Sequence, residues 1–191
     1  MKDHPVITLF GSSRPQEGSE EYLLAEELGR RLAEAGFSIC NGGYGGTMEA
    51  ASRGAAEEKE RAGRSGIRII GITCTVFGER KPNPWIEENI TTVSLFDRLQ
   101  RLLSLGDAYV VLRGGTGTLL ELALVWELIN KRMVDRRPIV LLGSFWERLL
   151  ETMKDEMERE GRPDPVLSTS VAPAPAECVQ LLTSQLRGEA S

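Results

Sequence analysis

The stretch that decides the fold is AYVVLRGGTGTLLELALVWEL, residues 108–128. Its first five residues, Ala108–Leu112, form an uninterrupted apolar run, which is typical of a strand buried on both faces of a sheet. A loop of small residues follows from Gly114 to Thr118, and an apolar run of helical length begins behind it. Strand, glycine-rich turn and helix in this order indicate one β-α unit of a parallel sheet.

The same alternation extends outward in both directions. Apolar strands are expected at Val6–Phe10, Phe37–Cys40, Ile67–Cys74 and Pro138–Leu142, with a short one at residues 90–94. Helical periodicity is seen at residues 19–35, 47–63, 95–103 and 145–160, and a last helix of about ten residues follows the proline-rich connection 171–177. Residues 75–89 have no clear period and are expected to form a loop. The pattern predicts an α/β protein with a doubly wound parallel sheet, helices on both faces and a single domain over residues 1–191.

Composition limits the function classes. The chain has 191 residues, is 41% hydrophobic and 27% charged, and carries a net charge of −5, so neither nucleic acid nor a membrane is an expected partner. The cysteines are scattered and His4 is the only histidine, which argues against a metal site and for buried thiols in a reducing compartment. The apolar run near the N-terminus is too short for a signal sequence or a membrane span. A cytoplasmic protein is the resulting expectation.

Three loops rich in glycine or serine follow predicted strands: GSSRP (11–15), NGGYGG (41–46) and RGGTGT (113–118). In a doubly wound sheet, ligands bind at this carboxyl edge. Free N–H groups at a helix start favour an anion, and the hydroxyls of Thr116 and Thr118 add donors, so phosphate binding is predicted. The spacing matches neither the lysine-containing P-loop nor the dinucleotide-binding fingerprint. The alternative is that these glycines only serve tight turns and close packing.

Glu121 is one of only two polar residues between Leu119 and Ile129, the other being Glu127. We expect so apolar a helix to be buried nearly all round, where an ionised carboxylate needs a partner. Helical side chains lean toward the N-terminus, so Glu121, four residues after Gly117, should point back at the loop's ligand. The helix dipole should favour its ionised form. The alternative is an ordinary helix charge or a buried ion pair, and Glu127 is interpreted as structural.

Arg98 lies off the apolar stripe of the preceding helix, beside Asp97 and Arg101. This pattern alone favours an arginine on a solvated face over a ligand-binding one.

Taken together, GSS (11–13), NGGYGGTMEA (41–50), FDRLQRL (96–102) and RGGTGTLLE (113–121) resemble, in order and spacing, the Lonely Guy family with its motif P-G-G-x-G-T-x-x-E. Members are often labelled "possible lysine decarboxylase", a name that these residues give no reason to adopt. The resemblance extends from about Val6 to Met157 and implies a Rossmann-like nucleotide-binding domain that forms a homodimer or larger oligomer. It implies hydrolysis of N6-substituted adenosine 5′-monophosphates, the cytokinin nucleotides, to free base and ribose 5-phosphate, without a metal or redox cofactor.

The resemblance also implies which residues form the site. Arg98 and Glu121 correspond by position to the catalytic pair of the family. The substrate and its phosphate would be bound by Gly11, Ser12, Ser13, Gly42, Gly43, Gly45, Gly46, Met48, Gly114, Gly115, Thr116, Gly117 and Thr118.

The chain departs from the family pattern at four positions. Arg113 replaces the motif proline, Leu99 replaces a lysine, Asn41 replaces the first of three glycines, and Trp126 is two positions early. Arg113 either adds a charge to ligand recognition or marks a subfamily with another substrate. An alternative function is a nucleotide or molybdenum-cofactor carrier without hydrolysis, and a purely structural role explains the loops and Glu121 least. The sequence leaves open whether residues 75–89 close over the site.

Overall fold

The computed structural model describes residues 4–161, 166 and 169–188. These residues contain one seven-stranded sheet, in which every neighbouring pair of strands is parallel and the order is β4-β3-β2-β1-β5-β6-β7. The strands are β1 (Val6–Phe10), β2 (Ser38–Asn41), β3 (Ile69–Cys74), β4 (Glu88–Thr92), β5 (Ala108–Val111), β6 (Ile139–Leu142) and β7 (Ser170–Ala172). The predicted doubly wound α/β fold is confirmed.

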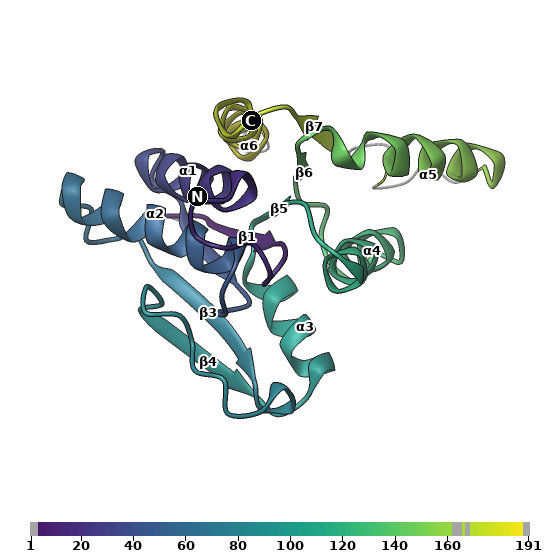
Figure 1. Cartoon of the computed structure of the whole chain (residues 1–191). Coiled ribbons are helices and arrows are strands. Elements are labelled where there is room, and N and C mark those ends of the chain that lie inside the picture. The colour runs from purple at the N-terminus through teal and green to yellow at the C-terminus, as the bar shows by residue number, and fades with distance from the viewer. Residues whose placement is uncertain (1–3, 162–165, 167–168, 189–191) are drawn as a thin grey trace.

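Helices cover both faces of the sheet (Figure 1). The helices are α1 (Glu20–Glu34), α2 (Thr47–Ala62), α3 (Leu95–Leu105), α4 (Thr116–Asn130), α5 (Glu147–Arg159) and α6 (Pro175–Gly188), with 3-10 turns η1 (Thr75–Phe77) and η2 (Ser144–Trp146). One core joins α1, α2 and α6 to the sheet, and a second core joins α3, α4 and α5 to its other face. Strand residues alternate between the cores: in β1, Ile7 belongs to the first and Phe10 to the second.

Strand order reverses between β1 and β5. From β1 the chain adds strands outward to β4, and it then returns through α3 to place β5 on the other side of β1. The loops that follow β1 and β5 therefore leave neighbouring strand ends toward opposite faces, and a crevice opens between them. This topology fixes where a ligand can bind.

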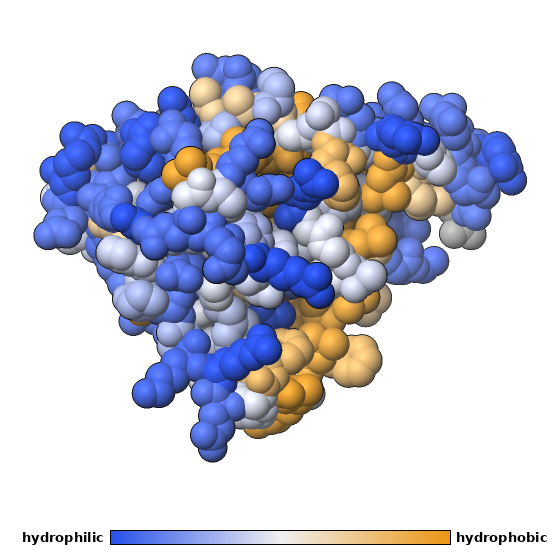
Figure 2. Space-filling model, in the orientation of Figure 1, coloured by the Kyte–Doolittle hydropathy of each residue, from blue (hydrophilic) through white to orange (hydrophobic). Residues whose placement is uncertain are grey.

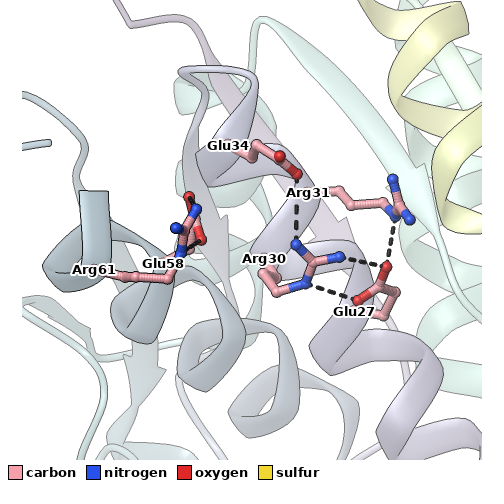
Figure 3. Close-up of polar contacts among 6 residues, drawn as sticks. All are labelled: Glu27, Arg30, Arg31, Glu34, Glu58 and Arg61. Atoms are coloured by element: carbon pink, nitrogen blue, oxygen red, sulfur yellow. Dashed lines mark hydrogen bonds and ion pairs between the residues drawn. The ribbon is translucent and has the colours of Figure 1, made fainter.

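Helices α1 and α2 pack closely because two glycines face the opposing backbone. A Cβ at Gly29 would meet the carbonyl of Ala51, and a Cβ at Gly54 would meet the carbonyl of Glu26. The outer faces carry ion pairs, shown in Figure 3, in which Arg30 donates to Glu27 at 2.7 and 2.8 Å. Such exposed pairs contribute little stability, so the close packing of the two helices is what holds this layer.

Three sequence expectations are corrected. The fourth strand begins at Glu88, before the expected residue 90. Its first residues are polar and lie on an exposed edge, so they lack the apolar pattern by which a buried strand is predicted. A three-residue strand, β7, overlaps the expected proline-rich connection and is too short to show a period. Helix α4 is not buried all round, since Leu119 and Leu120 are 39% and 45% exposed. Within the described ranges, no helix has the length and apolar character needed to cross a bilayer.

Candidate active site

A cavity of about 510 Å³ lies where the loops after β1, β2, β3 and β5 meet. Its volume falls in the ordinary range of small-molecule sites, roughly 300–1,000 Å³. It is lined by Leu9, Gly11, Ser12, Ser13, Arg14, Gly42, Tyr44, Met48, Phe77, Arg80, Arg98, Gly115, Thr116, Gly117, Thr118 and Glu121. The cavity therefore lies at the carboxyl edge of the sheet, as the topology requires.

The N-terminus of α4 forms one end of this cavity. Its N-cap is Gly115, in extended conformation, and no side chain in the described part of the chain caps the helix. The first N–H groups of this 15-residue helix therefore have no side-chain acceptor, and they face a cavity lined by residues 115–118. A helix start of this kind binds anions.

The β1 loop packs tightly onto the start of α2. The N–H and hydroxyl of Thr47 both donate to the carbonyl of Ser12, at 2.9 and 3.1 Å. Gly46 has a positive φ of 69°, and a Cβ there would meet the backbone of Ser12 and Ser13. Because this contact is so close, the β1 and β2 loops form one rigid wall of the cavity.

Arg98 crosses from α3 beneath the β2 loop and is 7% exposed. Its Nε donates to the carbonyl of Ile72 at 2.8 Å, and its Nη2 donates to the carbonyl of Gly42 at 3.3 Å. A Cβ at Gly42 would meet this guanidinium, so only glycine leaves room for it. The sequence pattern alone favours an arginine on a solvated face. That expectation is wrong, because these two carbonyls hold Arg98 inside the molecule.

Glu121 faces Arg98 across the cavity, with 3.7 Å between Oε1 and Nη1. Their side chains are 12% and 8% exposed. Burial raises the pKa of Glu121 from its ordinary value of 4.5 to about 7, and Arg98 lowers that pKa only in part. The expected stabilisation of the ionised form is therefore not found: desolvation of the carboxylate outweighs the nearby charge, so the ionised form is less favoured than in a free glutamate.

The end of the cavity opposite α4 is aromatic. The hydroxyl of Tyr44 donates to the carbonyl of Cys74 at 3.1 Å and accepts from its N–H at 2.8 Å. The ring of Phe77 packs edge-on against Tyr44, with centroids 5.9 Å apart. The Arg98 guanidinium lies 5.8 Å from the Tyr44 ring and 5.5 Å from the Phe77 ring. Arg98 therefore lies close to these two rings and also to Glu121 of α4.

The structure brings most of the predicted site residues into one cavity. Arg98 and Glu121 line it, together with Gly11, Ser12, Ser13, Gly42, Met48, Gly115, Thr116, Gly117 and Thr118. The predicted residues that do not line it are Gly43, Gly45, Gly46 and Gly114. Close packing requires glycine at some of these positions. At Gly114, for example, a Cβ would meet the side chain of Thr118.

Sequence reasoning missed five lining residues: Leu9 of β1, and Arg14, Tyr44, Phe77 and Arg80 in the loops. Arg14 and Tyr44 belong to the loops GSSRP and NGGYGG, whose glycines and serines alone were considered. Phe77 and Arg80 lie in the segment 75–89, which has no periodicity that would predict a contact with the site. Only the position of this segment beside the β2 loop reveals them.

Three of the four departures from the family pattern have distinct structural surroundings. Asn41 ties the β2 loop together: its amide donates to Ser52 at 2.9 Å and its Oδ1 accepts from Gly43 N–H at 2.8 Å. Leu99 is a core residue, 4% exposed. Arg113 does not line the cavity, and its guanidinium lies 4.9 Å from the ring of Phe145.

Fold and site together define a Rossmann-like α/β protein with a helix start suited to an anion and a buried arginine–glutamate pair beside it. The family described as "Possible lysine decarboxylase" matches residues 48–180, and the chain belongs to this family. The predicted Lonely Guy relationship is thereby confirmed.

Two named relatives share part of the chain. Over 126 residues the chain is 32% identical to a pyrimidine/purine nucleotide 5′-monophosphate nucleosidase of Escherichia coli (strain K12), which covers 64% of this chain but only 28% of that protein. Over 140 residues it is 26% identical to a cytokinin riboside 5′-monophosphate phosphoribohydrolase of Rhodococcoides fascians, covering 72% and 67% of the two chains. The chain thus matches little more than a quarter of the length of the first relative.

Solved structures show the same fold. A molybdenum cofactor binding protein from Rippkaea orientalis superimposes with a TM-score of 0.72 at 22% identity, over 97% of this chain and 99% of that one. The molybdenum cofactor carrier protein of Chlamydomonas reinhardtii gives 0.67 at 23% identity, over 96% and 99%. At these identities the likeness concerns the fold.

Proposed function

We propose that the chain hydrolyses the N-glycosidic bond of nucleoside 5′-monophosphates, including the N6-substituted adenosine type, to free base and ribose 5-phosphate. The observation that carries this proposal is the buried Arg98–Glu121 pair, 3.7 Å apart, in a cavity that also contains an uncapped helix start. The names of the relatives from E. coli and R. fascians support it.

The substrate phosphate would bind at the start of α4. Backbone N–H groups and the hydroxyls of Thr116 and Thr118 supply donors there. Arg14 and Arg80 also line the cavity and have no acidic partner within 4 Å in the described part of the chain. With the Arg98–Glu121 pair balanced, these two arginines leave the cavity positively charged. That charge complements a phosphate dianion within an otherwise acidic protein.

The glycosidic bond would lie beside Glu121. As the bond breaks, its electron pair moves to the base nitrogen, and positive charge develops at the ribose carbon. The Glu121 carboxylate stabilises that charge, accepts a proton from the attacking water and passes it to the departing base nitrogen, a cycle for which a pKa of about 7 is well matched. Arg98, fixed by two backbone carbonyls, orients the nucleotide and holds the carboxylate near it.

Measuring ribose 5-phosphate release from a panel of nucleoside 5′-monophosphates tests the proposal. Wild-type protein should release it, and Glu121→Gln should lower the rate by roughly a hundredfold or more while still binding nucleotide. Glu127→Gln is the matched control, since Glu127 lies on the same helix, exposed and outside this cavity. Full activity of Glu121→Gln would overturn the mechanism.

The same assay decides the alternative of a nucleotide or molybdenum-cofactor carrier. A carrier would retain a phosphorylated ligand and turn over none of the monophosphates. Binding of that ligand would raise the melting temperature of the protein.

We also propose that the protein is a homodimer or larger homo-oligomer. Four large apolar side chains are exposed around the start of α3 and α4: Val93, Phe96, Leu119 and Leu120. Figure 2 shows the apolar region over α3 and beside α4. A contiguous apolar surface of this kind is typical of an interface, and a second copy of the chain is the partner proposed.

A cytoplasmic location is proposed on the state of the cysteines. Cys40, Cys74 and Cys178 are all buried and free, as expected for a protein kept in a reducing compartment. Fractionation of the source cells, with the protein appearing in the cytosolic fraction, is the measurement.

A further inference from the structure

The β3 end of the cavity has the groups that a nucleobase would meet. Tyr44, Met48 and Phe77 supply apolar and aromatic surface there, and Arg80 enters from the segment that follows β3. Strands β3, β2, β1 and β5 are successive neighbours. At a spacing of about 4.8 Å, the ends of β3 and β5 are therefore about 14 Å apart.

A nucleotide bound with its phosphate at the start of α4 would extend along this row of strand ends. Its glycosidic bond would then pass Arg98 and Glu121, which lie between the two ends of the cavity. Its base would reach the aromatic end, beside Arg80.

We propose that Arg80 reads the base, and that the site prefers 6-oxopurine nucleotides, guanosine and inosine 5′-monophosphate, to adenosine 5′-monophosphate and its N6-substituted forms. This inference rests on the proposed function and changes only the base. The reason is the donor character of the guanidinium, which has five N–H groups and no acceptor.

Purine edges differ in what they offer such a group. Guanine and hypoxanthine present two adjacent acceptors, O6 and N7, which match an arginine fork. Adenine presents N7 beside a donor, its N6 amino group, so one arm of the fork meets another donor. An N6 substituent adds bulk at the same place.

The other side chains at the aromatic end do not supply the acceptor that adenine needs. The Tyr44 hydroxyl is already bonded to both backbone groups of Cys74. Met48 and Phe77 offer a weakly accepting thioether and a ring. Glu121, the one carboxylate among the described residues that line the cavity, faces Arg98. The hydroxyls of the remaining lining residues belong to the β1 and β5 loops, at the phosphate end.

The segment that carries Arg80 is anchored at both ends. Cys74 is tied to Tyr44 before it, and after it the N–H of Asn83 donates to the carbonyl of Gly43 at 2.8 Å. Arg80 itself has no acidic partner within 4 Å among the described residues. The anchored segment therefore places Arg80 at the cavity, and its exposed side chain is available to a ligand.

Initial-rate kinetics on three nucleotides test the inference. Wild-type protein should favour guanosine and inosine monophosphates over adenosine monophosphate by about tenfold or more in kcat/KM. Arg80→Ala should remove most of this preference, and Arg80→Gln should shift it toward adenosine monophosphate, because glutamine matches the donor–acceptor edge of adenine. Lys81→Ala is the matched control, because Lys81 is exposed and does not line the cavity, and should keep the wild-type ratio.

A binding measurement keeps the inference separate from catalysis. On the Glu121→Gln background, calorimetry should show that guanosine monophosphate binds more tightly than 7-deazaguanosine monophosphate, which lacks the N7 acceptor. Adding Arg80→Ala should abolish that difference.

The outcomes distinguish the two proposals. If no nucleotide releases ribose 5-phosphate, the proposed function is refuted. The calorimetric comparison of guanosine and 7-deazaguanosine monophosphates then tests the base preference by itself. Hydrolysis that favours adenosine monophosphate overturns the inference. So does an Arg80→Ala variant that weakens all three nucleotides by one common factor, because Arg80 would then supply charge without reading the base.

Discussion

At the scale of single residues, Arg98 is positioned by hydrogen bonds, whereas the main influence on Glu121 is desolvation. Arg98 is fixed by the carbonyls of Ile72 and Gly42, so its position follows from backbone. Glu121 lies on the second turn of α4 and is desolvated by burial, which raises its pKa to about 7. The ion pair is long, at 3.7 Å, and leaves the carboxylate able to exchange a proton near neutral pH.

The pH dependence of the reaction follows from this pKa. If Glu121 acts as a base, kcat/KM should rise about tenfold per pH unit below pH 7 and level above it. Arg98→Gln should move the midpoint to higher pH, because Arg98 lowers the pKa of Glu121. The phosphate of the substrate titrates near pH 6, so nucleotide binding to Glu121→Gln over the same range is the control. A midpoint near 4.5 in the wild type would contradict the assignment.

The free energy of unfolding should also depend on pH, because it is linked to the same raised pKa of Glu121. A carboxyl whose folded pKa is raised from 4.5 to about 7 stabilises the fold below pH 4.5 and loses that contribution as the pH rises through 7. At 1.4 kcal/mol per pKa unit, the loss is on the order of 3 kcal/mol. In urea unfolding from pH 4.5 to 8, Glu121→Gln should therefore become progressively more stable relative to wild type. A constant difference between the two would show that Glu121 has an ordinary pKa.

At the scale of elements, the segment 75–83 connects the sheet to the site. It leaves β3 through η1, carries Phe77 and Arg80 into the cavity, and returns at Asn83, which is 8% exposed. The Asn83 amide donates to the carbonyl of Tyr44 at 3.0 Å and its Oδ1 accepts from Trp85 N–H at 3.1 Å. One buried side chain thus anchors an otherwise exposed loop.

Asn83→Ala should loosen this segment. Losing the buried hydrogen bonds costs about 1–3 kcal/mol locally, so trypsin should cleave faster after Arg80 and KM for nucleotides should rise. Limited proteolysis followed by mass spectrometry is the measurement. Asn89→Ala, which removes only partly exposed side-chain bonds on β4, should cleave at the wild-type rate. Equal rates for the wild type and Asn83→Ala would mean that Asn83 does not anchor the segment.

At the scale of the whole molecule, the exposed apolar side chains near α3 and α4 are on or next to the two helices that carry the Arg98–Glu121 pair. Phe96 is 82% exposed, and it is two residues before Arg98 on α3. Leu120 is 45% exposed and directly precedes Glu121 on α4. An interface built on this surface would involve both helices that carry the Arg98–Glu121 pair, so assembly and activity are expected to be linked.

Phe96→Asp should therefore reduce the oligomer to a monomer, because it would bury a charge in an apolar contact. Sedimentation velocity at micromolar concentration measures the mass directly. Leu23→Asp, a 52% exposed leucine on α1 in the other helix layer, should leave the wild-type mass unchanged. A wild-type protein that is already monomeric would refute the proposed assembly.

The sequence by itself determined the parallel α/β sheet, because buried strands and glycine-rich helix starts leave strong local patterns, and it indicated Glu121 through the rarity of a carboxylate in an apolar helix. Only the tertiary structure decided that Arg98 is buried and that Tyr44, Phe77 and Arg80 line the cavity. The reason is physical: the contact of α3 with the β2 loop and the anchoring of segment 75–83 depend on elements distant in sequence, so no local periodicity reports them. The same is true of the pKa of Glu121, because desolvation is a property of the assembled cavity.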